Sequence, residues 1–177
     1  MRSIFLTLFS LICFSVVAQV DAFQKDIIEY LNVKGTHREY NETYIGVLDA
    51  VKKNFKASNV PENVWEEMQT DKDKDLEELI FFMSFAYRKH FTQKEINSMT
   101  NFYKTDAAQR MIAQYESLTD NDNTEITAFF ESELGKKITQ KQPELATDIK
   151  EISTQWKSDL FVKKMSFLVK KGYVPKQ

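Results

Sequence analysis

The sequence predicts an all-α fold, a helical bundle of about seven to nine helices. Three observations support this prediction. The 177 residues include only 4 glycines and 3 prolines, too few for the many turns of a β fold. Apolar residues recur at intervals of three and four along most of the chain, which is the period of an amphipathic helix. A degenerate helix–corner–helix repeat is followed by a long C-terminal helix.

The repeat relates residues 100–111 to residues 127–138, which lie 27 positions later. Two copies of one helix–corner–helix unit would diverge in this way, with chemical character kept better than identity. The corresponding pairs include Tyr103 and Phe130, Thr105 and Ser132, and Arg110 and Lys137.

The N-terminal residues predict a signal peptide. Arg2 precedes an apolar stretch at residues 4–17, which is short for a bilayer span and has the length of a signal-peptide core. Small residues place the cleavage after Ala18, and a second, less favoured point follows Ala22. An uncleaved anchor or a buried first helix is the alternative. We therefore expect an exported protein, periplasmic or secreted.

Removal of residues 1–18 leaves a single helical domain at residues 19–177. Cys13 is the only cysteine and lies within the predicted signal peptide, so the mature chain has no internal disulfide. Ile12 stands where a lipoprotein signal requires a small residue, which argues against lipidation. A domain of this size can be held together by packing alone.

The first helices follow from apolar spacing and capping residues. Phe23, Ile27 and Leu31 recur every four residues and predict a helix that Gly35 ends in a left-handed conformation. Thr36 and Glu39 have the spacing of a capping box, which predicts the start of a second helix. Its apolar face continues to Phe55, and Asn59 with Pro61 is expected to end it.

Two further helices are expected before the repeat. A short one contains Trp65, and a longer one begins in the acidic segment at residues 71–75 and ends at Phe91. The alternating carboxylates of residues 71–75 and 120–123 have the form of a calcium loop. Leu76 and Glu125 stand where that loop requires glycine, so both segments are interpreted as helix starts. In the repeat itself, Thr92 and Glu95 form a second capping box, and the units are placed at about residues 92–118 and 119–142.

The segment around the first unit reads Phe91-Thr92 with Glu95, then Phe102-Tyr103-Lys104-Thr105 with Ala108-Gln109-Arg110. It resembles the bacterial domain-of-unknown-function family 2059, whose signature runs roughly threonine, acid, phenylalanine-tyrosine, serine-proline, glycine, lysine. The resemblance covers about residues 87–143, with Asp106 in place of the usual proline and Ala108 in place of glycine. It implies an exported all-helical protein without an assigned activity, and it supplies no catalytic residues.

After the repeat we expect a closing helix at about residues 143–171. Apolar residues step by three and four from Leu145 to Leu160, and the second half of the helix is apolar on more than one face. We interpret it as a helix packed on two sides. The alternative is a basic amphipathic segment that contacts an anionic membrane surface or a partner protein. Its basic contact surface would consist of Lys157, Lys163, Lys164, Lys170 and Lys171.

Residues for catalysis and metal binding are missing from the sequence pattern. His37 and His90 are the only histidines, neither has a second histidine at helical spacing, and both are expected at the surface or at a boundary. No glycine-rich phosphate loop and no nucleophile elbow is present. We predict a non-enzymatic protein without catalytic residues, metal ligands or a cofactor. The net charge of −2 argues against nucleic acid as a partner.

The aromatic content of 13% suits either a phenylalanine-rich core or an apolar groove between helices, and the sequence leaves both open. We predict an interaction or binding module of the cell envelope that contacts an unknown protein partner. The alternative is a carrier of a hydrophobic ligand, such as a lipid, held in a groove between helices. The candidate core or groove residues are Phe102, Tyr103, Phe129, Phe130, Trp156 and Phe167.

Overall fold

A computed structural model describes residues 21–113 and 118–175, and within these ranges the chain forms helices and no strands. The predicted all-α class is confirmed, and the eight α-helices of the described ranges fall within the predicted number. The predicted signal peptide lies outside the described residues. The elements are α1 (Ala22–Val33), α2 (Thr36–Asn54), the 3-10 helix η1 (Lys56–Ser58), α3 (Glu62–Met68), α4 (Lys72–His90), α5 (Gln93–Tyr103), α6 (Asp106–Ala113), α7 (Asp120–Glu131) and α8 (Glu133–Lys170).

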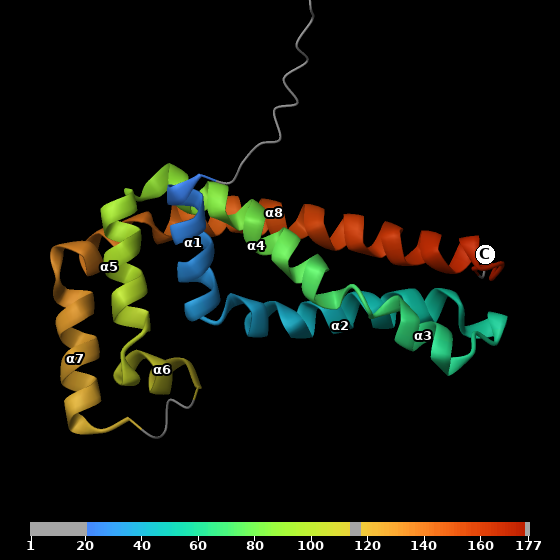
Figure 1. The fold of residues 1–177 in the computed structure, drawn as a ribbon, viewed down its shortest axis with the longest axis horizontal. Helices are drawn as coiled ribbons and strands as arrows, with labels where there is room; N and C mark the ends of the chain where they lie inside the picture. The colour runs from blue at the N-terminus through green and yellow to red at the C-terminus, as the bar shows by residue number, and fades with distance from the viewer. Residues whose placement is uncertain (1–20, 114–117, 176–177) are drawn as a thin grey trace, which may run out of the picture.

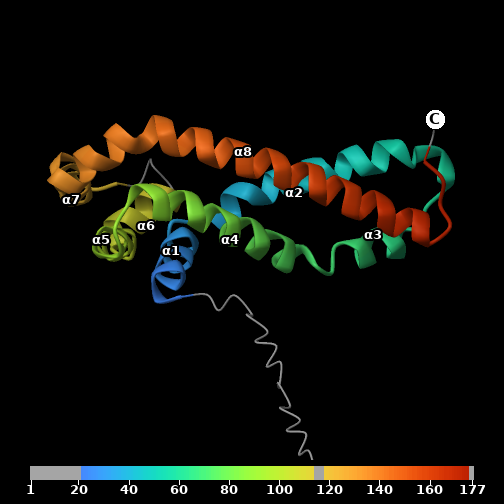
Figure 2. The same ribbon diagram turned by 90° about the horizontal axis from the view of Figure 1, so that it is seen from above.

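The long helix α8 organises the molecule. It runs from the end that carries α5 and α7 to the opposite end, beside α3 (Figures 1 and 2). α2 and α4 pack against α8, whereas α1 packs against α4 and α5. In Figure 1, α1, α5 and α7 run across the direction of α8. We call α2, α3, α4 and the second half of α8 the body, and α5 to α7 with the start of α8 the repeat pair.

The core joins these two parts. Tyr30 of α1 packs edge-on against Tyr87 of α4 and Tyr103 of α5, with ring centroids 5.3 and 5.7 Å away. In the body, Trp156 and Leu168 of α8 are buried against the other helices. The second half of α8 therefore supplies one wall of the core, as expected for a helix that closes the bundle.

Local capping rules succeed at Thr92 and fail at Thr36. The Thr92–Glu95 capping box is present in both directions, as predicted. At the start of α2 the N-cap is Gly35 with φ 87°, and Thr36 lies inside the helix with a buried hydroxyl that has no hydrogen-bond partner among the described residues. The predicted capping box at Thr36 is wrong because α1 and α2 meet at Gly35, and this places Thr36 one position too late to cap.

Pro143 lies inside α8 and does not begin a new helix. The closing helix expected from about residue 143 is continuous with the second helix of the repeat and begins at Glu133. Proline removes only one backbone donor from a helix, and a long helix held by tertiary packing can absorb that loss. The Thr147 hydroxyl also donates a hydrogen bond to the Pro143 carbonyl, at 3.0 Å.

The repeat predicted from the sequence is present as two helix–corner–helix units. α5 and α6 form the first unit, and α7 with the first turns of α8 forms the second. In each unit a hydroxyl caps the second helix. The Thr105 hydroxyl accepts from the Ala108 N–H at 3.3 Å, and the Ser132 hydroxyl accepts from the Gly135 N–H at 3.1 Å. The corresponding residues thus perform the same local task.

The two units face each other with pseudo-two-fold symmetry. Phe102 and Phe129 occupy corresponding positions, and their rings stack with centroids 3.8 Å apart and planes 1° from parallel. Ion pairs cross between the units reciprocally. Glu95 of the first unit binds Lys137 of the second at 2.7 Å, and Asp122 of the second binds Arg110 of the first at 3.0 Å. A two-fold axis between the units generates this exchange of corresponding partners.

Candidate binding groove

A groove of about 520 Å³ runs along the surface between α4 and α8. Its centre is apolar and one end is acidic. The volume falls in the range of sites that hold small molecules or a few side chains of a partner. The lining residues are Asp75, Glu78, Phe82, Phe85, Ile152, Gln155, Trp156, Asp159, Leu160 and Lys163.

The α4 wall carries an exposed aromatic pair. Phe82 and Phe85 are 44% and 48% exposed, and both rings pack edge-on against Phe81. They lie on the same face of α4 as Glu78, at helical spacings of four and three. Two neighbouring phenylalanines at this exposure form an apolar patch rather than isolated surface residues.

The α8 wall is centred on Trp156. Its indole N–H donates a hydrogen bond to the Asp75 carbonyl at 2.9 Å, which fixes the ring between the two helices. On its other side Trp156 packs edge-on against Tyr40, with the ring centroids 6.3 Å apart. The indole is therefore held in one orientation before anything binds in the groove.

A buried ion pair joins the two helices at the acidic end of the groove. The Lys164 ammonium lies 2.7 Å from the Asp75 carboxylate and donates to the Met68 carbonyl at 2.8 Å. Lys163 also pairs with Asp75. Burial, together with the Asp75 charge, raises the pKa of Tyr44 to about 12, so this tyrosine stays neutral near the cluster.

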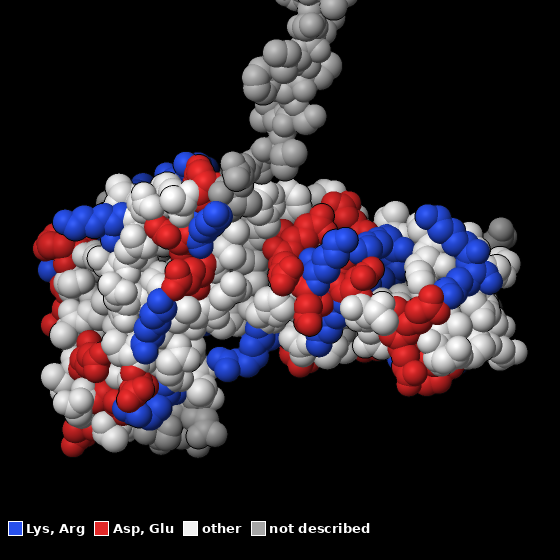
Figure 3. Space-filling view, in the orientation of Figure 1, with Lys and Arg blue, Asp and Glu red and all other residues white. Residues whose placement is uncertain are grey.

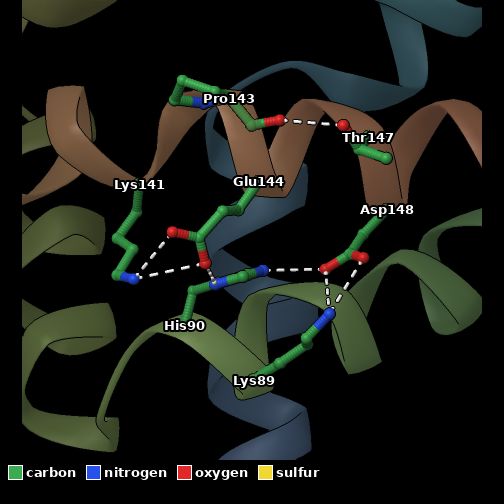
Figure 4. Close-up of polar contacts among 7 residues, drawn as sticks. All are labelled: Lys89, His90, Lys141, Pro143, Glu144, Thr147 and Asp148. Carbon is green, nitrogen blue, oxygen red and sulfur yellow. Dashed lines mark hydrogen bonds and ion pairs between the residues drawn. The ribbon is translucent and has the colours of Figure 1, made fainter.

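A second polar cluster joins α4 to α8 near the aromatic end (Figure 4). His90 Nε2 lies 2.7 Å from an Asp148 oxygen, His90 Nδ1 lies 3.7 Å from Glu144, and Lys89 reaches both Asp148 oxygens at 3.0 Å. Hydrogen bonds from His90 and Lys89 lower the pKa of Asp148. The expectation that His90 is a surface or boundary residue is wrong, since it is only 8% exposed. Its partners follow 54 and 58 residues later, beyond the reach of a local pattern.

Two carboxylates at the groove remain without a cationic partner among the described residues. Glu78 and Asp159 are exposed and lie on opposite walls. Asp159 accepts a hydrogen bond from the Gln155 side chain at 2.9 Å. Because Lys163 is already paired with Asp75, the acidic end of the groove carries excess negative charge.

Four of the six aromatic residues selected from the sequence form one cluster in the repeat pair, around Phe102, whereas Trp156 and Phe167 lie elsewhere. Trp156 lines the groove, whereas Phe102 and Tyr103 are buried in the core. Phe129 is half-buried and stacks on Phe102, and the exposed Phe130 packs edge-on against both rings. Phe167 lies at a separate cleft of about 490 Å³ beside Lys163, Lys164 and Lys170.

Sequence reasoning missed Phe82 and Phe85 as groove residues. The core face of α4 follows the residues from Leu76 to Tyr87 at intervals of three and four. Phe82 and Phe85 lie off that face. Large apolar residues outside an already complete core stripe are the sequence signal that could have indicated an exposed apolar surface. Their place in a groove could not be predicted, because the sequence does not show that α8 lies beside α4.

The five lysines proposed as a basic surface have different surroundings. Lys164 is buried and forms an ion pair with Asp75, which also pairs with Lys163. Lys171 binds Glu67 at 2.7 Å. Lys157 and Lys170 are exposed. Figure 3 shows basic and acidic side chains interspersed on this face near the C-terminal end of α8.

Metal-ligand clusters and membrane-spanning helices are both missing from the described residues. Within residues 21–113 and 118–175 no three His, Cys, Asp or Glu side chains are grouped so that they could hold a metal ion. In the same ranges no helix combines the length and the hydropathy that a membrane crossing requires.

The fold and the groove define an all-α protein that combines a pseudo-symmetric repeat pair with an exposed apolar groove. Residues 77–124 and 115–161 each match the model of the family described as "Uncharacterized protein conserved in bacteria (DUF2059)". The resemblance seen in the sequence is confirmed, and it extends over residues 77–161. The matches include most of α4, the repeat pair and α8 up to residue 161. No curated protein and no solved structure matches the chain.

Proposed function

We propose that this protein is a non-enzymatic interaction module of the bacterial cell envelope, and that a partner protein binds in the groove between α4 and α8. The observation that carries the proposal is the exposed pair Phe82 and Phe85 beside the fixed ring of Trp156. Aromatic side chains at the centre of a protein interface supply most of its binding energy when they become buried.

The open form of the groove favours a partner protein over a carried ligand. A carrier encloses most of its ligand, whereas here Phe82 and Phe85 are about half exposed. Phe102 is buried in the core, and neither Phe129 nor Phe167 lines the groove. A carried hydrophobic ligand is therefore the less favoured occupant of the groove.

The capping of α1 favours cleavage after Ala18 over cleavage after Ala22. The Asp21 side chain accepts from the Gln24 N–H at 2.8 Å and binds Arg88 at 2.7 Å. Cleavage after Ala22 would remove both contacts, whereas cleavage after Ala18 keeps them. We expect intact-mass measurement of the exported protein to give Gln19 as its first residue. A mature chain that begins at Phe23 would contradict this expectation.

The proposed groove contact is tested by affinity capture from the native envelope with the mature protein as bait. The double variant Phe82→Ser with Phe85→Ser is compared with wild type and with Val162→Ser. Val162 is an exposed apolar residue of α8 that does not line the groove. We expect one partner to be retained by wild type and Val162→Ser, and its affinity for the double variant, measured with purified proteins, to fall by a factor of about 10 or more.

Two results would overturn the proposal. A partner that binds the double variant as tightly as wild type would place the interface elsewhere. A small apolar compound that copurifies with wild type, and that native mass spectrometry finds missing from the double variant, would make the protein a carrier.

A further inference from the structure

The groove has two chemically different ends. α4 and α8 run antiparallel, because Asp75 pairs with Lys164 while His90 pairs with Asp148. This register places Glu78 near Asp159 and Phe85 near Ile152. Carboxylates therefore lie at the end next to Asp75, and aromatic and aliphatic side chains lie at the end next to His90.

The negative charge at the first end is available to a ligand. The Asp75 carboxylate is already compensated by Lys163 and Lys164. Glu78 and Asp159 have no cationic partner among the described residues, and both are exposed. Carboxylates beside an apolar wall interact more strongly with an approaching cation than carboxylates surrounded by water.

We infer that the groove accepts a basic amphipathic segment of the partner protein. This inference rests on the function proposed above and names the chemistry of the bound segment. The apolar side chains of the segment lie against Phe82, Phe85 and Trp156, and its lysine or arginine side chains lie at Glu78 and Asp159. An acidic segment would bring like charges together, and a neutral one would leave both carboxylates without a counter-charge.

The length of the groove fits a helical segment. Glu78 and Phe85 are seven residues apart on α4, which corresponds to about 10 Å along the helix axis. Two turns of a docked helix cover this distance and present apolar anchors at positions i, i+3 or i+4, and i+7. A basic residue beside the last anchor then reaches the carboxylates at the acidic end.

Calorimetric titration with three matched peptides tests the inference. The capped peptides, each about four turns long, share leucine and phenylalanine anchors at the helix-in-groove spacing, and the flanking positions carry lysine, glutamine or glutamate. We expect the lysine peptide to bind about 10 times more tightly than the glutamine peptide, with the glutamate peptide weakest. The preference should shrink when the salt concentration is raised from 0.05 to about 0.5 M.

Paired variants locate the charge effect. Glu78→Gln with Asp159→Asn should reduce the preference for lysine over glutamine to about twofold or less, while the glutamine peptide keeps its affinity. Glu77→Gln with Glu151→Gln makes the same change in net charge at exposed residues that do not line the groove, and should keep the preference.

The outcomes separate this inference from the proposed function. If the three peptides bind equally, or if the glutamate peptide binds best, the inference is overturned, while a groove that needs Phe82 and Phe85 for binding still supports an interaction module. Loss of the preference in both double variants would also overturn it, because the effect would then be one of net charge. If no peptide binds, the inference fails, and the capture experiment decides the proposed function independently.

Discussion

Asp122 and Glu95 perform the same task in the two repeat units, but in different surroundings. Each carboxylate completes a capping box and binds the basic residue of the opposite unit. The Asp122 side chain is 2% exposed, and that of Glu95 is 26% exposed. The Arg110 guanidinium, followed by the Thr119 backbone N–H, holds the pKa of Asp122 well below its usual range. At Glu95, partial burial raises the pKa, but the contacts with Lys137 and Thr92 outweigh it and lower the pKa.

This difference predicts unequal costs for neutral substitutions. Asp122→Asn should lower the thermal midpoint of unfolding at pH 7 more than Glu95→Gln, because it removes the buried carboxylate that Arg110 binds. A carboxyl with a depressed pKa stabilises the fold above its unfolded pKa, near 3.8, and loses that contribution as the pH falls through the folded pKa. The midpoints of wild type and Asp122→Asn should therefore converge below about pH 4. A gap that stays constant from pH 7 to pH 2 would contradict this account.

Gly135 is required by the sharp corner between α7 and α8. A Cβ atom added there would lie 2.4 Å from the carbonyl oxygens of both Phe129 and Phe130. Backbone atoms cannot move aside as a flexible side chain can, so Gly135→Ala should lower the free energy of unfolding by about 1–3 kcal/mol. Gly46→Ala is the matched control, because a Cβ at Gly46 meets nothing within 4 Å. Denaturant unfolding should show Gly46→Ala unchanged or more stable by about 0.5–1 kcal/mol.

At the scale of elements, the contact between α4 and α8 is fixed by the Asp75–Lys164 pair and the His90–Asp148 pair, with the groove between them. Both pairs join residues more than 50 positions apart in sequence. The position of the groove walls therefore depends on polar contacts that have no local sequence signature.

Lys164→Met tests the buried pair. The substitution keeps most of the side-chain volume but leaves the buried Asp75 with Lys163 alone, and should cost about 3 kcal/mol in urea unfolding. Lys157→Met, at an exposed position of the same helix, should change stability by less than about 0.5 kcal/mol. Adding Asp75→Leu to Lys164→Met should recover part of the loss, because the uncompensated charge is then removed as well. No loss in Lys164→Met would show that the pair does not hold the helices together.

Elements set by local chemistry could be predicted, and those set by distant contacts could not. The cap at Thr92 acts within three residues, and the spacing of Thr92 and Glu95 predicted the helix start there. The boundary expected at Pro143 was displaced to Glu133, since packing keeps α8 continuous through a residue that weakens an isolated helix. Of the six aromatic candidates only Trp156 lines the groove, because the groove exists only where α4 and α8 are side by side.

At the scale of the whole molecule, the second half of α8 completes the body. Trp156, Leu160 and Leu168 are buried, and Lys164 neutralises Asp75 from the same helix. Truncation after Thr154 should therefore abolish cooperative folding, measured as loss of the near-ultraviolet circular dichroism signal and of dispersed amide resonances. Deletion of residues 174–177 removes no buried core residue of the described chain and should leave a folded protein. A Thr154 truncation that still unfolds cooperatively would show that the last part of α8 is a separable contact segment.

The position of α8 after the other helices also sets the order in which the body and the repeat pair can form. α1 to α4 are synthesised first. The core that they share lacks the wall supplied by α8 until residues 155–170 have been made. The repeat pair is complete sooner, because its last helix starts at Glu133. Under the export proposed above, closure of the body would wait until residues 155–170 have crossed the membrane.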